Sequence, residues 1–279
     1  MTAETLEIQR DRFGRPRIVP PDGSKPTYYT RVSTMAKTLE DTYTLGQWQQ
    51  RQVIRGLALK SALVDRAITA VTVGDAKGED PKAALQEIVD EAHVIAGSSD
   101  AAEYGTSVHA WAEYADFHDH DVSRIPADMR ADVAAYRLTL EEAGVVPLEA
   151  ETFVVCDRLR CAGSFDRLYR MPDGAVVIGD IKTGSWGAQY GTQSWAIQLA
   201  IYANSMRYLG TKEREALHAD LDLTRGLLVT MPARTGSCAL HELDLVAGWE
   251  AAQVAHWVRA YRKQNVSTAL ADAKVIFDL

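Results

Sequence analysis

The feature that most constrains this chain is a short turn signal between two runs of strand-forming residues. The segment from Met171 to Gly174 reads Met-Pro-Asp-Gly, with glycine where a tight turn needs a positive φ angle. A three-residue loop would pair Met171 with Ala175, and counting outward then places Asp166 opposite Asp180. Opposed residues of an antiparallel pair share a face, with Cβ atoms roughly 5 Å apart. Lys182 follows Asp180 by two residues, so the prediction places all three charges on one face.

The charges at the end of the second strand need partners. Residues 175–178 are all apolar, which predicts a buried central strand. An ionised side chain there is costly unless it is paired or binds a metal. One interpretation is a buried salt bridge between Asp180 and Lys182. The other includes Asp166, because two close carboxylates repel each other unless a cation lies between them, and hard divalent cations prefer oxygen ligands. The facing Asp166 favours the second interpretation.

The same residues resemble a known nuclease core. Gly163 and Asp166, followed by the hairpin and then by Asp180 and Lys182, are similar to the Gly-x-x-Asp and Asp-x-Lys motifs of the PD-(D/E)xK nuclease superfamily. The resemblance implies a restriction-endonuclease-like α/β fold, in which helices flank a mixed β-sheet.

Two further motifs resemble the RecB-like exonuclease branch of that superfamily. Gly105 and His109 match its Gly-x-x-x-His motif, and Gln198 and Tyr202 match its Gln-x-x-x-Tyr motif. Each motif is short, but the four occur in the expected order over residues 105–202. Residues 29–34 and 45–48 are also similar to the opening of phage-encoded, free-standing members.

The resemblance implies a metal-dependent DNA exonuclease. Its implied metal ligands, for Mg²⁺ or Mn²⁺, are His109, Asp166, Asp180 and the main-chain carbonyl of Ile181. Lys182 is implied to position the attacking water or to stabilise the transition state. Gln198 and Tyr202 complete the implied catalytic set with Asp166, Asp180 and Lys182, either by reaching a phosphate or by orienting Lys182.

Two alternatives stay open beside the exonuclease. The first is a structure-selective endonuclease, and the second is a catalytically silent nucleic-acid-binding protein of the same fold. The resemblance also implies a role in phage DNA recombination, repair or replication. A phage single-strand annealing protein is the implied partner, and homo-oligomerisation is left open.

Several of these residues also have a packing interpretation. His109 and Glu113 share a helix face, where His109 could be a core histidine and Glu113 a surface acid or a residue that supports the metal ligands. Gln198 and Tyr202 could simply pack their helix onto the sheet, and Tyr202 could do both with its ring and its hydroxyl.

Two further pairs of residues are ambiguous in the sequence. Glu149 and Glu151 lie at the start of the first predicted core strand, and either could be an extra acid of the site, because alternation does not tell which one points inward. Gly163 and Gly179 would permit close approach of a backbone or of DNA, or would mark a bulge.

Composition favours an ordinary globular protein of 279 residues with 47% hydrophobic and 24% charged residues. Its net charge of −8 is unexpected for a DNA-binding protein, because phosphate contacts need Lys or Arg. Arginines cluster near the N-terminus and around the predicted hairpin, and we interpret any one of them as a solvated strand-edge residue; they are Arg10, Arg12, Arg15, Arg17, Arg158, Arg160, Arg167 and Arg170.

The sequence also predicts several absences. Three cysteines, Cys156, Cys161 and Cys238, are too few for the four-cysteine iron–sulfur cluster of some RecB-like nucleases. There is no nucleotide-binding phosphate loop. We expect no membrane segment and no signal peptide, and therefore a cytoplasmic location, which is the host cytoplasm if the protein is phage-encoded.

The pattern predicts an N-terminal arm or hairpin over residues 1–33 and a single nuclease domain over residues 34–279. Helical composition is expected over about 35–72, with interruptions near Gly46 and Gly56, and then a loop over 74–80. Further helices are expected over 81–96, 100–117, 126–144, 190–209 and 244–262, and strands over 148–157, 160–170, 175–183, 223–231 and 238–243. This order predicts an α/β fold with a largely helical N-terminal half.

Overall fold

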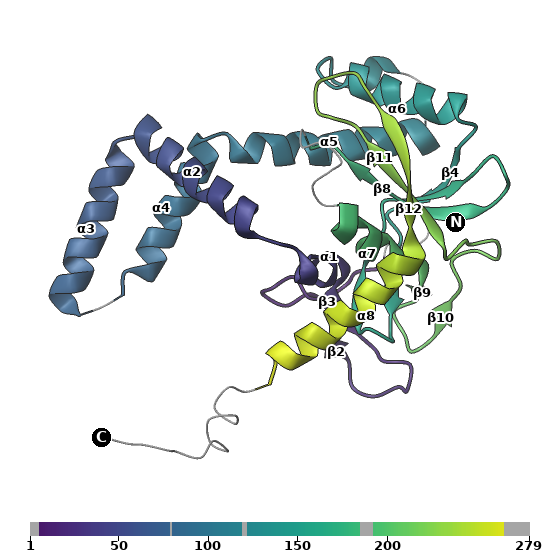
Figure 1. Cartoon of the computed structure of the whole chain (residues 1–279), viewed down its shortest axis with the longest axis horizontal. Coiled ribbons are helices and arrows are strands. Elements are labelled where there is room, and N and C mark those ends of the chain that lie inside the picture. The colour runs from purple at the N-terminus through teal and green to yellow at the C-terminus, as the bar shows by residue number, and fades with distance from the viewer. Residues whose placement is uncertain (1–5, 79, 119–121, 185–191, 265–279) are drawn as a thin grey trace.

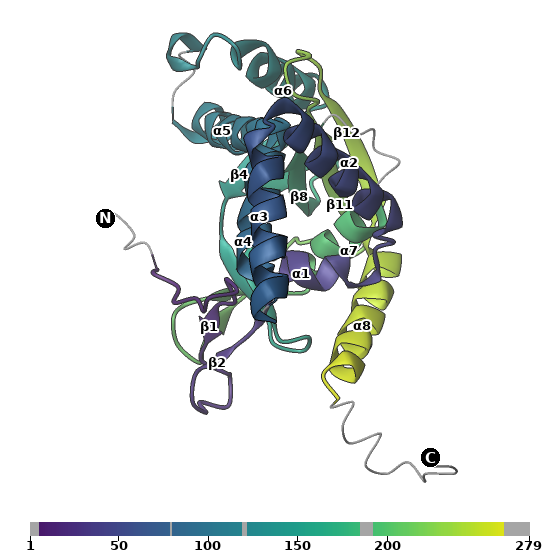
Figure 2. The same cartoon turned by 90° about the vertical axis from the view of Figure 1, so that its left-hand side faces the viewer.

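The computed structural model describes residues 6–78, 80–118, 122–184 and 192–264 (Figures 1 and 2). It is an α/β structure in which helices flank mixed β-sheets, as predicted. One five-stranded sheet carries the candidate site, in the order β12-β11-β8-β7-β4. Its strands are β4 (Val146–Ala150), β7 (Arg167–Arg170), β8 (Val176–Lys182), β11 (Arg225–Thr230) and β12 (Ala239–Asp244). β8 is central and pairs parallel with β11 and antiparallel with β7, which makes the sheet mixed.

The register of the β7–β8 hairpin is the predicted one. The Met171 amide donates to the Ala175 carbonyl at 2.8 Å, and Gly174 has φ +88°. Arg167 then pairs with Gly179, so the next position outward sets Asp166 opposite Asp180. All residues of β8 before Lys182 are buried, which confirms the predicted central strand.

A second five-stranded sheet has the order β10-β9-β5-β6-β3. Its strands are β3 (Thr30–Arg31), β5 (Phe153–Cys156), β6 (Cys161–Ser164), β9 (Met206–Tyr208) and β10 (Arg214–Glu215). The predicted strands 148–157 and 160–170 were wrong in one respect, since each is divided between the two sheets. The first breaks at Glu151, which adopts a left-handed φ of +48°, and the second breaks at Phe165 and Asp166.

The N-terminal region contributes to the main body. A two-stranded sheet pairs β1 (Arg17–Ile18) with β2 (Thr27–Tyr28). Ile18 and Tyr29 are buried against Val155 and Tyr208 of the second sheet. β3 extends that sheet by pairing parallel with β6. The division of the chain at residue 33 remains a prediction.

Helices cover both faces of the first sheet. α5 and α6 pack on the face formed by residues such as Tyr169, Val177 and Ile181. α1, α7 and α8 pack on the opposite face, around Leu168 and Ile178. The helices are α1 (Val32–Ala36), η1 (Lys37–Leu39), α2 (Tyr43–Leu59), α3 (Ala62–Lys77), α4 (Lys82–Ile95), α5 (Ser98–Phe117), η2 (Val122–Arg124), α6 (Arg130–Glu142), α7 (Thr192–Ala203) and α8 (Leu245–Arg262).

Helices α2, α3 and α4 form a lobe that projects away from the sheets (Figure 1). The buried residues of its hydrophobic core are Leu63, Ile88 and Ala92. The predicted helix break at Gly56 is wrong, because this glycine lies inside α2 and lets it approach α4: a Cβ there would lie 2.1 Å from the Ala92 carbonyl oxygen. No interruption occurs at Gly46 either, and the breaks fall instead at residues 40–42 and 60–61.

Some of the other predicted helix boundaries agree with the structure and others do not. Asp244 begins α8 as predicted, because its carboxylate accepts hydrogen bonds from the amides of Val246 and Ala247. The predicted helix over 190–209 is shorter, since α7 ends at Ala203 and β9 follows it. α3 also continues to Lys77, which lies inside the predicted loop. No helix in the described part of the chain is both long and apolar enough to cross a membrane.

Candidate active site and metal centre

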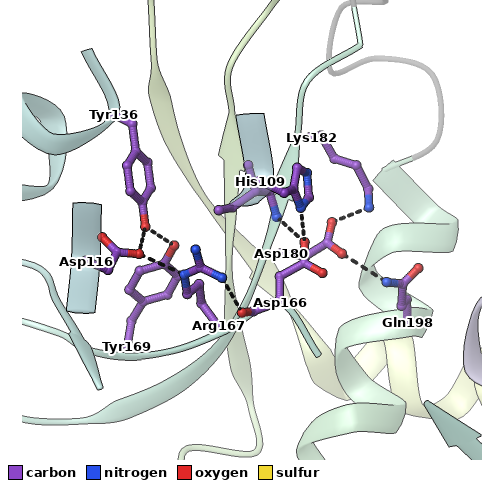
Figure 3. Close-up of polar contacts among 10 residues, drawn as sticks. His109, Asp116, Tyr136, Asp166, Arg167, Tyr169, Asp180, Lys182 and Gln198 are labelled. Atoms are coloured by element: carbon purple, nitrogen blue, oxygen red, sulfur yellow. Dashed lines mark hydrogen bonds and ion pairs between the residues drawn. The ribbon is translucent and has the colours of Figure 1, made fainter. Parts of the chain in front are cut away.

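The predicted site residues meet where β8 ends. Asp180 and Lys182 lie on β8, and Asp166 lies just before β7 on the facing strand. α5 brings His109 from one side of the sheet, and α7 brings Gln198 from the other (Figure 3). Segments far apart in sequence therefore converge on the two aspartates, as the motifs predicted.

Asp180 is almost fully buried, with 2% of its surface exposed. Gln198 Nε2 donates to its Oδ1 at 2.9 Å, and Lys182 Nζ lies 2.5 Å from its Oδ2 (Figure 3). The ion pair considered as an alternative is therefore present. Burial and the neighbouring Asp166 nevertheless raise the pKa of Asp180 to about 7. The ion pair with Lys182 therefore does not offset the cost of ionising this carboxylate.

Asp166 is held by the backbone of the opposite strand. The Ile181 amide donates to its Oδ2 at 2.9 Å, and His109 Nδ1 lies 3.6 Å from the same oxygen. Burial lowers the pKa of His109, although the charge of Asp166 opposes this. A neutral imidazole results near pH 7, which is the form that can offer a nitrogen to a metal.

A third donor joins this pair. Ligand atoms of His109, Glu151 and Asp166 all lie within 4.8 Å of one another. Removal from water, together with the charges of Asp166 and Glu113, raises the pKa of Glu151 to about 7. Two carboxylate oxygens and one imidazole nitrogen form a donor set that suits a divalent cation. The chemistry of these side chains therefore fits a metal.

Glu151 is the acid that sequence reasoning left unresolved. Its left-handed backbone, at the break between β4 and β5, turns its side chain into the site. Glu149 instead ion-pairs with Arg207 and accepts a hydrogen bond from Thr152. Among the described residues, the donor cluster includes His109 and Asp166 of the predicted ligands but not Asp180, whose oxygens contact Lys182 and Gln198.

His109 and Glu151 of the cluster line an open cleft of about 570 Å³. Its walls include Thr106 and Glu113 from α5, Glu151, and residues 181–184 at the end of β8. Lys182 also lines it, with 29% of its side chain exposed. The cleft thus gives a solvent-borne substrate access to Glu113, Glu151 and Lys182.

Glycines of the motifs permit close packing beside the site. A Cβ on Gly105 would lie 2.6 Å from Thr183 Oγ1, so this glycine lets α5 approach the end of β8. A Cβ on Gly179 would lie 2.3 Å from the Tyr169 ring. The close approach predicted at Gly179 is therefore made by a neighbouring side chain, the Tyr169 ring.

Tyr202 lies in the core rather than in the cleft. It is 5% exposed, and its ring packs edge-on against Phe165 at 6.4 Å between centroids. A Cβ on Gly163 would lie 3.1 Å from its hydroxyl. This arrangement favours the packing interpretation over direct phosphate contact. Gln198 orients Asp180 and not Lys182.

A buried polar network behind Asp166 was missed. Arg167, interpreted above as a solvated strand-edge residue, is 0% exposed, so that interpretation was wrong. It ion-pairs with Asp116 of α5, which also accepts a hydrogen bond from Tyr136; the Tyr136 and Tyr169 hydroxyls are 3.0 Å apart (Figure 3). The available signal was the spacing of Asp116, which follows His109 by seven residues (116 − 109) and so shares its helix face.

Comparison with known proteins agrees with this geometry. A family model for the PD-(D/E)XK nuclease superfamily matches residues 62–224, which is more than half of the chain. The matched region contains the donor cluster, Lys182 and Gln198. No curated protein matches the chain.

Proposed function

The chain belongs to the PD-(D/E)XK nuclease superfamily, and on that premise we propose that it is a metal-dependent DNA exonuclease of the RecB-like branch. The observation that carries the proposal is the meeting of Asp166, Asp180 and Lys182 at the end of β8, with His109 and Glu151 within reach. The His109 and Gln198 motifs, which resemble the exonuclease branch, support the finer assignment.

His109, Glu151 and Asp166 would hold the metal, and Asp180 would join them by exchanging its contact with Lys182. Oxygen-rich ligands of this kind suit Mg²⁺ or Mn²⁺. Such a cation, when bound, lowers the pKa of water and offsets negative charge on a phosphate. The ligand set proposed here therefore adds Glu151 to the residues that the motifs imply.

Lys182 would act on the phosphate. Its ammonium group reaches the cleft from the same face as the two aspartates, where it can stabilise charge that builds up on the phosphoryl oxygens. Gln198 would keep Asp180 in place through its 2.9 Å hydrogen bond. Tyr202 would support that arrangement by packing under Gly163.

The biological setting is proposed from the resemblance. The enzyme would act in the cytoplasm on DNA during phage recombination, repair or replication, together with a single-strand annealing protein. A self-assembled oligomer is compatible with that role. The protein has a net charge of −8, and its cleft contains the acids Glu113 and Glu151. These negative charges would repel DNA phosphates, so a bound cation would be needed to offset them.

The test uses end-labelled linear duplex DNA and closed circular DNA of the same sequence. With Mg²⁺, the linear form should be degraded and the circle largely spared, and excess chelator should stop the reaction. Asp180→Ala should abolish cleavage, whereas Asp173→Asn, in the hairpin turn, should not. Rapid cutting of closed circles would move the assignment to an endonuclease, and full activity in chelator would remove the metal mechanism.

A further inference from the structure

A buried arginine lies directly behind the candidate metal site. Arg167 Nη1 donates to the main-chain carbonyl of Asp166 at 2.7 Å, and its Nε donates to Asp116 Oδ2 at 2.8 Å (Figure 3). We propose that Arg167 is a positioning residue, which with Asp116 holds Asp166 and α5 in the geometry that binds the metal. This inference rests on the metal-dependent function proposed above.

The ion pair joins the two elements that carry ligands. Asp116 and His109 share one face of α5, about two turns apart. Asp166 directly precedes Arg167 on β7's side of the site. The pair therefore fixes α5 against β7 at a second point, beside the 3.6 Å approach of His109 Nδ1 to Asp166 Oδ2. A shift of the helix at Asp116 would be transmitted to His109.

Packing alone does not account for the guanidinium. A buried ion pair is often no more stabilising than apolar side chains of similar volume. Nη2 of Arg167 is moreover buried with no hydrogen-bond partner among the described residues, and an unpaired buried donor is unfavourable. The chain thus keeps a cation here at a cost in stability, next to the acids of the site.

A double variant that removes both charges tests whether Arg167 positions the metal ligands or only neutralises Asp116. Asp116→Asn with Arg167→Met removes both charges together, and the asparagine still offers an acceptor to the Tyr136 hydroxyl. Because neither charge is left unpaired, this double variant should melt within a few degrees of the wild type. Its Mn²⁺ affinity, measured by calorimetry on folded protein, should nevertheless fall by about 10- to 100-fold, as is usual when a residue that orients a metal ligand is lost.

A matched control removes another ion pair, which joins the turn after β5 to β10 of the second sheet. Asp157→Asn with Arg214→Met replaces the 2.8 Å pair between these residues and should leave Mn²⁺ affinity unchanged. Arg167→Lys provides a second variant, which keeps the charge but lacks the planar fork that contacts Asp116 and the Asp166 carbonyl together. It should also weaken Mn²⁺ binding, and it carries the test if the double variant does not fold.

The outcomes distinguish this inference from the proposed function. Wild-type Mn²⁺ binding that disappears in Asp166→Asn supports the metal site itself. Given that, unchanged affinity in the folded Arg167 variants overturns the positioning role and leaves the metal site standing. An equal loss of affinity in the control pair also overturns it, because the effect would then be general. Absence of wild-type binding overturns both proposals.

Discussion

Neutralising Asp180 should stabilise the metal-free protein, and the size of the effect depends on pH. The pKa of Asp180 is about 7 in the fold, compared with an ordinary 3.8, because of burial first and of Asp166 second. The folded protein therefore keeps a proton that the unfolded chain releases. The contribution of this proton to the free energy of unfolding is fully present below the unfolded pKa. It is lost as pH rises from about 4 through about 7.

The magnitude follows from the difference between the two pKa values. About three pKa units at about 1.4 kcal/mol each give roughly 4 kcal/mol above pH 7, and below about 1 kcal/mol at pH 4. This value already includes the attraction of Lys182, which lowers the pKa of Asp180. Asp180→Asn removes the cost of ionisation, and its side-chain oxygen can still accept the hydrogen bond from Gln198.

The assay is thermal melting in chelator at pH 8 and at pH 4. At pH 8 the Asp180→Asn variant should melt roughly 7 °C above the wild type, and at pH 4 the two should nearly coincide. Added Mg²⁺ should stabilise the wild type more than the variant. Asp173→Asn is the matched control. The hydrogen bond from Arg225 lowers the pKa of Asp173, so removing the charge of Asp173 should not raise the melting temperature. A variant that melts well below the wild type at pH 8 would show that the pair with Lys182 outweighs the repulsion, and would refute this reasoning.

Three further predictions address other residues. Lys182→Ala should lower the single-turnover cleavage rate by about 10²–10³ with little change in DNA or metal affinity, and Lys182→Arg should not restore it; near-wild-type rates would contradict its role. Glu151→Gln should weaken Mn²⁺ binding, measured by calorimetry, about tenfold or more, whereas Glu149→Gln should not. Weaker binding in Glu149→Gln alone would show that Glu149, and not Glu151, is the metal ligand. Asp132→Ala should lower the free energy of unfolding by about 3 kcal/mol in denaturant melts, because three donors, including the Tyr104 hydroxyl, lose their acceptor; a change near zero would mean that solvent replaces it.

The sequence was sufficient for the hairpin because its turn and its register are local. Gly174 and the count outward from it determine that Asp166 faces Asp180, with no knowledge of the rest of the fold. Asp244 was equally predictable, because an N-cap needs only its own helix. That His109 and Gln198 lie beside the two aspartates could be expected for a different reason, since the resemblance of their motifs to a known family implied the long-range contact.

What could not be predicted depends on distant partners. The division of strands between two sheets requires the left-handed turn at Glu151, and a glutamate there carries no local signal for it. The same turn decides that Glu151, and not Glu149, reaches the donor cluster. Arg167 looks like a surface residue until Asp116, which lies 51 residues earlier, is brought against it. Gly56 predicts a break by its propensity, but tight packing against α4 overrides it.

The place of β3 and α1 in the fold has a consequence for how the chain is made. Thr30 pairs with Cys161, and Met35 packs in one cluster with Ile197, which the ribosome adds 162 residues later (197 − 35). At about 5–20 residues per second, this segment waits roughly 10 to 30 s for its partners. Helices α2 to α4 contact one another and can fold during that interval. Slowing synthesis between the two segments should therefore prolong exposure of Val32 and Met35, and make the nascent chain depend more on chaperones.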